Sequence, residues 1–304
     1  MFIGHALLAF ALAVRGAERL SVPRERALRF GVLAALFAAI PDVDVVYAPV
    51  GLLMQSAETV GPDVFWETAN VIHRGPTHSL VMAGTLALAV FLWAVGTRGA
   101  RALSLSLAAA LVAVGALFSG AVGGVVVLVF VGSGFAVGEL AAREGLAPRP
   151  LLAAALVGLW SHPFGDLFTG SPPPFLYPFD VVLVAERVAL HPDPTGQLLA
   201  AFAVELGAIW LAVWTYAHLT DRRLTDLVSP RASLGAGYAA AALLLPAPTM
   251  ERSAHFVFSV LAIGVVGAPV RPFSSGVDPL RVVVTGLAAV TVAAVAYATT
   301  YGVL

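Results

Sequence analysis

The sequence predicts an all-α, polytopic integral membrane protein of about ten helices, and three observations lead to that fold class. Hydrophobic residues make up 59% of the 304-residue chain and charged residues only 12%, whereas soluble domains carry about 25% charged residues. The mean hydropathy is +0.91. Apolar runs of helical length recur from one end of the chain to the other. Such a chain is expected to fold in a lipid bilayer, where helices satisfy their own backbone hydrogen bonds.

The expected helices are spread over the whole chain. Hydropathy places them at residues 2–14, 28–40, 78–96, 102–118, 121–140, 151–168, 197–217, 233–247, 254–270 and 281–302. No basic residue precedes the first run and no clear cleavage site follows it, so it is expected to be retained as a helix. We expect residues 1–220 to form a membrane-embedded core that carries the site, and residues 221–304 to add further transmembrane helices.

The arginines predict the orientation in the membrane. All 17 basic residues are arginine, and 14 of them fall in every second connection between the expected helices. The other three are Arg74, Arg187 and Arg252. Short cytoplasmic loops are enriched in basic residues. The amino terminus and the long connections 41–77 and 169–196 are therefore expected outside the cytoplasm, in a multi-pass protein of the cell membrane.

Charge and cysteine content exclude several functions. The formal net charge is -1, and no stretch combines dense basic residues with aromatic ones, so nucleic-acid binding is not expected. The chain has no cysteine, which excludes disulfides, thiolate metal sites and cysteine nucleophiles. Any metal ion must therefore be held by histidine, aspartate, glutamate or backbone oxygen atoms.

Four short segments carry the unusual polar residues, and the predicted topology puts all four at the outer face. They are residues 4–5, 41–44, 73–79 and 161–166. Their candidate metal ligands are His5, Asp42, Asp44, His73, His78, His162 and Asp166. Four histidines and three aspartates suit zinc, or manganese, as one or two ions, and a single ion would leave several donors unused.

The spacing within these segments supports a shared site. His162 and Asp166 are four residues apart, which places an imidazole and a carboxylate on one helical face. Pro76 suits the first turn of a helix, so His73 is expected in the preceding loop and His78 in that first turn. Each residue also has a structural interpretation: an interfacial histidine, a helix cap, or a buried hydrogen bond between histidine and aspartate.

Two further residues are candidates for catalysis. Arg74 is expected either to contact an oxyanion or phosphate, or to form a salt bridge with Asp42 or Asp44. Glu205, in the seventh expected helix, is expected to be a further ligand, a proton-transfer group or a buried hydrogen-bonded carboxylate. The remaining histidines, His191, His218 and His255, have no partner motif and are interpreted as structural or solvated.

These segments resemble the YdjM-like family of inner-membrane proteins, described as metal-dependent hydrolases and as LexA-binding. The resemblance rests on His5, Pro-Asp-Val-Asp at 41–44, His-Arg-Gly-Pro-Thr-His-Ser at 73–79 and Ser-His-Pro-Phe-Gly-Asp at 161–166, followed by Tyr-Pro-Phe at 177–179. It covers about residues 1–180. Pro163 departs from the aliphatic residues expected there and puts the pairing of His162 with Asp166 in question. The ligand order is also similar, more remotely, to that of zinc-dependent phospholipase C, an analogy that implies a phosphodiesterase-like site.

Together these features predict a metal-dependent hydrolase that uses a metal-activated water on a phosphoester or lipid-derived substrate. The expected partner is a membrane lipid or another small molecule at the outer leaflet. The alternative is a transporter of metal ions or small solutes that uses the same cluster. Transport requires polar groups through the bilayer, and beyond Glu205 the chief one is Glu139. A third hypothesis, a structural scaffold for partners, predicts no bound metal.

Overall fold

The computed structural model describes residues 2–47, 74–268 and 278–303. Within these ranges the regular structure consists of ten α-helices and five 3-10 helices, without a β-strand. The all-α fold class is therefore confirmed for the described part of the chain. The chain consists of two compact units, Met1–Arg187 and Val188–Leu304. Each unit is described by itself.

The first unit is a set of closely packed helices. Its elements are α1 (Phe2–Arg19), α2 (Arg24–Ala39), η1 (Pro41–Tyr47), η2 (Pro76–His78), α5 (Leu80–Val95), α6 (Arg98–Arg143), α7 (Pro148–Gly165) and η3 (Asp166–Phe168). Helix α2 packs against α1 and α7, and α5 packs against α6 and α7. The core combines many alanines with a few large side chains, among them Phe37, Phe130 and Leu159, all without exposed surface. Small residues let the helix backbones approach closely, as in many membrane bundles.

Helices α2 and α7 approach each other closely at Gly158. A Cβ atom at this position would collide with the carbonyl oxygen of Ala34 and would lie 2.6 Å from the Cβ of Phe37. Only glycine therefore allows α7 to lie directly against the α2 backbone. Since η1 follows α2 and η3 follows α7, this contact also brings the segments that end both helices together.

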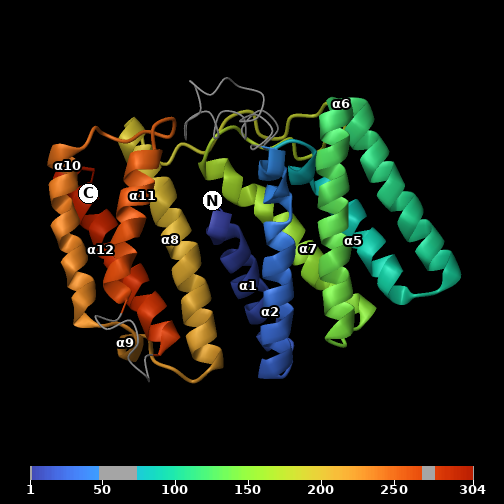
Figure 1. The fold of residues 1–304 in the computed structure, drawn as a ribbon, viewed down its shortest axis with the longest axis horizontal. Helices are drawn as coiled ribbons and strands as arrows, with labels where there is room; N and C mark the ends of the chain where they lie inside the picture. The colour runs from blue at the N-terminus through green and yellow to red at the C-terminus, as the bar shows by residue number, and fades with distance from the viewer. Residues whose placement is uncertain (1, 48–73, 269–277, 304) are drawn as a thin grey trace. The chain divides into compact units, whose positions relative to one another are not determined.

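Helix α6 consists of two arms joined by a break. Gly120 has φ 70° and ψ -175°, a conformation favoured by glycine, and the chain folds back on itself there (Figure 1). A Cβ at Gly123 would collide with the side chain of Ser119 and lie 2.8 Å from the carbonyl oxygen of Gly115, so small residues also line the contact between the arms. The two arms correspond to the expected helices 102–118 and 121–140.

The second unit has a separate core. Its elements are α8 (Pro194–Leu219), α9 (Leu224–Leu227), η4 (Pro230–Ala240), α10 (Ala241–Leu244), α11 (Ala254–Ala262), η5 (Ile263–Gly267) and α12 (Pro279–Tyr301). The core includes several aromatic side chains, with Phe256 placed between Phe202 and Tyr297 at ring-centroid distances of 5.7 and 5.1 Å. Helix α8 contributes Phe202 to this core, and the compact unit begins at residue 188. The expected division into a membrane-embedded core, 1–220, and additional transmembrane helices, 221–304, stays a prediction.

Four of the described helical segments are long and apolar enough to cross a membrane. They are α6, α7 together with η3, α8 and α12. Each of the ten ranges expected from hydropathy overlaps a helical segment, but α5 and the segment Ala254–Gly267 are shorter than a full span. The range 233–247 is largely 3-10 helix rather than α-helix. Length and composition thus support four candidate membrane-spanning segments, and a polytopic fold of ten helices stays a prediction.

Candidate metal centre

The ends of several elements of the first unit converge on one buried cluster of polar side chains. His5 lies in the first turns of α1, Asp42 and Asp44 lie in η1, His78 ends η2, and His162 and Asp166 lie where α7 passes into η3. Five of these residues are at most 2% exposed: His5, Asp44, His78, His162 and Asp166. The side chain of Asp42 is 15% exposed. The cluster is therefore enclosed by protein and reaches the surface chiefly at Asp42.

His162 is fixed by the carboxyl end of α2. Its Nδ1 lies 2.7 Å from the carbonyl oxygen of Ala38. A carbonyl oxygen only accepts hydrogen bonds, so Nδ1 carries the ring proton and donates it. The Nε2 atom of the neutral ring is then left with a lone pair, which faces the centre of the cluster.

His78 is oriented by Thr77 and Asp44. The Thr77 hydroxyl donates to Asp44 Oδ2 at 3.0 Å and lies 2.9 Å from His78 Nδ1. Because its one proton is used on the carboxylate, the hydroxyl accepts from Nδ1 of His78. The Nε2 atom of His78 therefore also presents a lone pair. A carboxylate behind a histidine in this way fixes the ring for metal binding in many metal sites.

The two Nε2 atoms meet 3.0 Å apart, with carboxylate oxygens beside them. Asp42 Oδ1 lies 3.5 Å from Nε2 of His162 and 3.8 Å from Nε2 of His78. Asp166 Oδ2 lies 3.7 and 3.2 Å from the same two nitrogens and forms no hydrogen bond with the described residues. Two facing lone pairs repel each other unless a cation or a proton lies between them. The cluster is thus built around a positive charge.

The separations of these donor atoms fit a zinc-sized ion. Zinc bonds to nitrogen and oxygen of about 2.0–2.2 Å place the donors of a tetrahedral site about 3.3–3.6 Å apart. The five distances measured among the two nitrogens and two oxygens run from 3.0 to 3.8 Å. The described residues can therefore hold a divalent cation without a large rearrangement.

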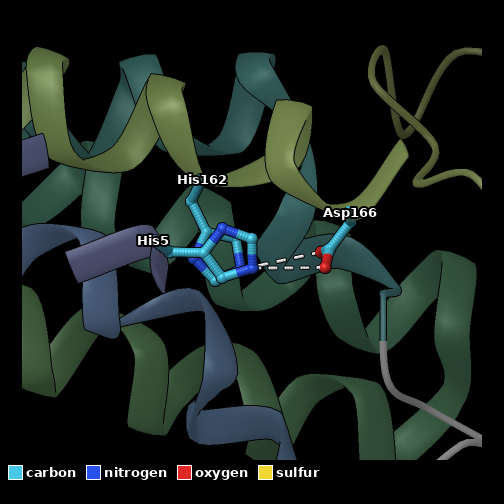
Figure 2. A group of neighbouring side chains, drawn as sticks. All are labelled: His5, His162 and Asp166. Carbon is cyan, nitrogen blue, oxygen red and sulfur yellow. Dashed lines mark ion pairs between the residues drawn. The ribbon is translucent and has the colours of Figure 1, made fainter. Parts of the chain in front are cut away.

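His5 lies beside this donor set (Figure 2). Its ring lies against that of His162, with centroids 4.0 Å apart, and its Nε2 is 3.3 Å from Asp166 Oδ1. Neither ring nitrogen of His5 forms a hydrogen bond with the described residues. A Cβ at Gly165 would collide with the His5 ring, so a glycine is needed at the end of α7. Two combinations of donors lie within 4.8 Å of one another: His5, His162 and Asp166, and Asp42, His78 and His162.

Arg74 adopts φ 65° and holds the segment that follows η3. Its guanidinium donates to the carbonyl oxygens of Thr169 and Ser171 at 2.5 and 2.8 Å and to the Thr169 hydroxyl at 2.7 Å. It also lies 3.3 Å from Asp166 Oδ1. Its salt bridge is thus with Asp166, rather than with Asp42 or Asp44 as the sequence suggested; only its backbone N–H donates to Asp44, at 3.2 Å.

Two residues outside the apolar helices show the electrostatic character of the cluster. Burial alone raises the pKa of Asp42, but the nearby imidazoles of His162 and His78 outweigh it and hold that pKa well below the usual range. Burial lowers the pKa of His78, but Asp166, Asp42 and Asp44 outweigh it and raise the pKa to about 9. Without an ion, His78 therefore carries the positive charge at neutral pH.

The other residues expected from the sequence are placed differently. His73 lies outside the described residues. Glu205 lies half-buried on α8, in the second unit, and its role stays a prediction. Pro163 lies inside α7, yet the side chains of His162 and Asp166 still face one another. Sequence reasoning gave no role to Thr77, although it directly precedes His78 in the motif.

The described residues are all helical, with candidate membrane spans and a buried cluster of histidines and aspartates. These features place the protein in the class of helical membrane proteins with a candidate metal centre. The chain belongs to the YdjM inner membrane protein family, whose model matches residues 1–228. The matched region contains the whole cluster and extends beyond the residues 1–180 that carry the motifs. Comparison with curated proteins and with solved structures finds no match.

Proposed function

We propose that this protein is a metal-dependent hydrolase whose ion is held by Asp42, His78, His162 and Asp166. One observation carries the proposal: two imidazole lone pairs and two carboxylate oxygens converge in a buried cluster at separations that suit a divalent cation. A divalent ion bound there supplies Lewis-acid activation of a water molecule and of the scissile bond. Nitrogen and oxygen donors at these distances favour zinc, with manganese as the alternative.

The protein itself positions the donors and controls access to them. Thr77 and Asp44 fix the ring of His78, and the Ala38 carbonyl fixes that of His162. Asp42 is the most exposed of the four proposed ligands, so water and substrate reach the centre from its side. The hydrogen bonds of Arg74 to Thr169 and Ser171 assign it to holding the protein chain rather than to binding substrate.

The proposed substrate is a phosphoester, most naturally a lipid-derived one at the outer leaflet. The apolar helices and the family place the cluster in a membrane protein, where lipids are the most abundant small molecules at hand. The arginine distribution supports an extracytoplasmic position of the long connection 41–77, which follows α2. The similarity of ligand order to zinc-dependent phospholipase C supports phosphoester chemistry by analogy.

The distribution of buried polar groups favours hydrolysis over transport. Within the described part of the first unit, the buried polar side chains lie in the cluster or in the turn at Ser79, apart from Ser104. Ser104 donates to the carbonyl oxygen of Ala89 within the helical core. Buried charged side chains outside the cluster are absent from the described residues. A transported ion would need such groups along its path through the hydrocarbon.

The test is chelator-sensitive turnover. Purified protein in lipid nanodiscs should hydrolyse a chromogenic phosphodiester lipid analogue, lose the activity with a chelator and regain it with added zinc. His162→Ala should abolish turnover, and His255→Ala should retain it, because the His255 ring hydrogen-bonds to the carbonyl oxygen of Pro246 in the second unit. A screen of phosphoesters, acyl esters and amides without chelator-sensitive turnover, together with metal accumulation in proteoliposomes, would favour the transporter instead.

A further inference from the structure

The structure assigns a single divalent ion to this cluster, with the guanidinium of Arg74 in the place of a second cation. This inference rests on the metal-binding part of the proposed function and is independent of hydrolysis. The sequence leaves one or two ions open, with seven candidate ligands being more than one ion uses. The candidate ligands that one ion does not use have other roles. These roles follow from the contacts of His162, Asp44, Asp166 and Arg74.

His162 limits the number of ions. The two donor combinations within 4.8 Å, one with His5 and Asp166 and the other with Asp42 and His78, both contain His162. Its Nδ1 donates to the carbonyl oxygen of Ala38, so Nε2 alone can bind a metal. One nitrogen lone pair binds one ion. The two combinations are therefore alternative descriptions of one site and cannot be filled together.

Asp44 and Asp166 direct carboxylate oxygens to partners other than a second ion. Asp44 Oδ2 accepts from the Thr77 hydroxyl and from the backbone N–H of Arg74, on the far side of the His78 ring from Nε2. Asp166 directs Oδ2 towards His78 and Oδ1 towards Arg74. A second ion between His5 and Asp166 Oδ1 would lie next to the guanidinium, since both groups are 3.3 Å from that oxygen.

Arg74 is held firmly in that position. Its side chain is 12% exposed, and its hydrogen bonds to Thr169 and Ser171 fix both terminal nitrogens. An arginine guanidinium carries a permanent positive charge in proteins. It therefore acts as a permanent positive charge beside Asp166 and repels a divalent ion from the same oxygen.

Among the described residues, the charges of the cluster balance with one ion. The carboxylates of Asp42, Asp44 and Asp166 contribute three negative charges, and one divalent ion with Arg74 contributes three positive ones. A second divalent ion would leave two uncompensated positive charges in an enclosed cluster, which is strongly unfavourable.

Metal stoichiometry in the intact protein tests the inference. Purified full-length protein loaded with zinc should contain one equivalent by mass spectrometry, and the manganese-loaded protein should give an uncoupled Mn²⁺ spectrum in electron paramagnetic resonance. His73→Ala should retain the one equivalent. Two equivalents, a spin-coupled spectrum or loss of an ion in His73→Ala would overturn the single-ion assignment while leaving metal binding intact. Absence of any bound metal would overturn both this assignment and the proposed metal-dependent function.

The role of Arg74 is tested by removing its charge. Arg74→Ala should take up a second, weaker ion as the manganese concentration rises, whereas wild type should stay at one equivalent. Arg231→Ala is the matched control, because Arg231 likewise donates to a backbone carbonyl, that of Ala268, but in the second unit. It should also stay at one equivalent. If Arg74→Ala never exceeds one equivalent, the guanidinium is not what excludes the second ion.

Discussion

At the scale of single residues, His162 connects the fold to the proposed chemistry. One ring nitrogen donates to the last turn of α2, and the other faces His78, Asp42 and Asp166. The backbone of α2 thus determines which nitrogen is offered to an ion. A histidine with free rotation would have to be ordered on binding, at a cost in side-chain entropy.

The first prediction concerns the ligands themselves. His162→Ala combined with Asp166→Ala removes one nitrogen and one oxygen donor, so most of the bound metal should be lost. Metal content of the purified variant, measured by inductively coupled plasma mass spectrometry, provides the test. The double variant should be compared with His255→Ala, which should keep its metal. Unchanged metal content in the double variant would contradict the assignment.

Thr77 gives a second prediction, because its hydroxyl joins Asp44 to His78. Thr77→Val keeps the shape but removes both hydrogen bonds, leaving the imidazole without its orienting partner. Zinc affinity should fall about 10-fold to 100-fold, as for other residues that orient metal ligands. Competition with a fluorescent chelator measures this change. Thr85→Val is the control, since the Thr85 hydroxyl only bonds the carbonyl of Val81 in its own helix.

The pKa of His78 gives a third prediction. The surrounding carboxylates raise that pKa from 6.5 to about 9, so the metal-free protein holds a proton that an ion must displace. Between these pH values, binding should release about one proton, and affinity should rise about tenfold per pH unit. Calorimetry in buffers of different ionisation enthalpy would measure the release. The proton also stabilises the metal-free fold at low pH, and this contribution should be lost as the pH rises through about 9. Binding that is independent of pH over this range would contradict the proposed displacement.

At the scale of elements, the contact between α2 and α7 assembles the centre. Helix α2 supplies the Ala38 carbonyl and leads into η1, and α7 supplies His162 and leads into η3. Gly158 permits the contact, because any side chain there would meet the α2 backbone. The register of these two helices therefore sets the donor distances.

Gly158→Ala should separate α2 from α7. We expect a loss of about 1–3 kcal/mol in the free energy of unfolding, typical of an overpacked core, together with reduced metal content. Gly132→Ala on α6 is the matched control, since a Cβ there meets nothing within 4 Å. That control should be neutral or stabilised by about 0.4–1 kcal/mol. Denaturant titration in detergent measures the free energy of unfolding of both variants. If Gly158→Ala is as stable as wild type, α2 and α7 tolerate being moved apart.

At the scale of the whole molecule, the first unit holds the whole cluster, and the family match extends through residue 228. The second unit has its own aromatic core and contributes two of the four candidate spans, α8 and α12. The buried charged residues of the described chain all lie in the first unit. We therefore expect the proposed chemistry to depend on the first unit.

Membrane orientation is the prediction at this scale. In this cysteine-free chain, Ser171→Cys and Thr225→Cys introduce single thiols at exposed positions. The arginine distribution predicts that an impermeant maleimide added to intact cells reacts at position 171 and not at position 225. Labelling at both positions after lysis is the control for accessibility. The opposite pattern in intact cells would place the centre on the cytoplasmic side and exclude outer-leaflet lipid as its substrate.

The sequence by itself determined the fold class, the helical segments and the pool of donor residues. Hydropathy and helix-breaking residues act locally, so even the break between the arms of α6 at Gly120 was predictable. Local signals were less informative about η4, where an apolar stretch forms a 3-10 helix instead of the expected α-helix. The 3-10 helix η4 packs against α12, and hydropathy along the sequence does not encode this contact.

Only the tertiary structure decided what each donor does. His162 is oriented by a carbonyl 124 residues away in the sequence, and Arg74 is paired with Asp166 rather than with the aspartates nearer in the chain. Asp44 lies behind His78, while Asp42 lies among the facing nitrogens. Such roles depend on distances of a few ångströms between separate helices. Those distances follow from how the helices pack, and not from the spacing of residues along the chain.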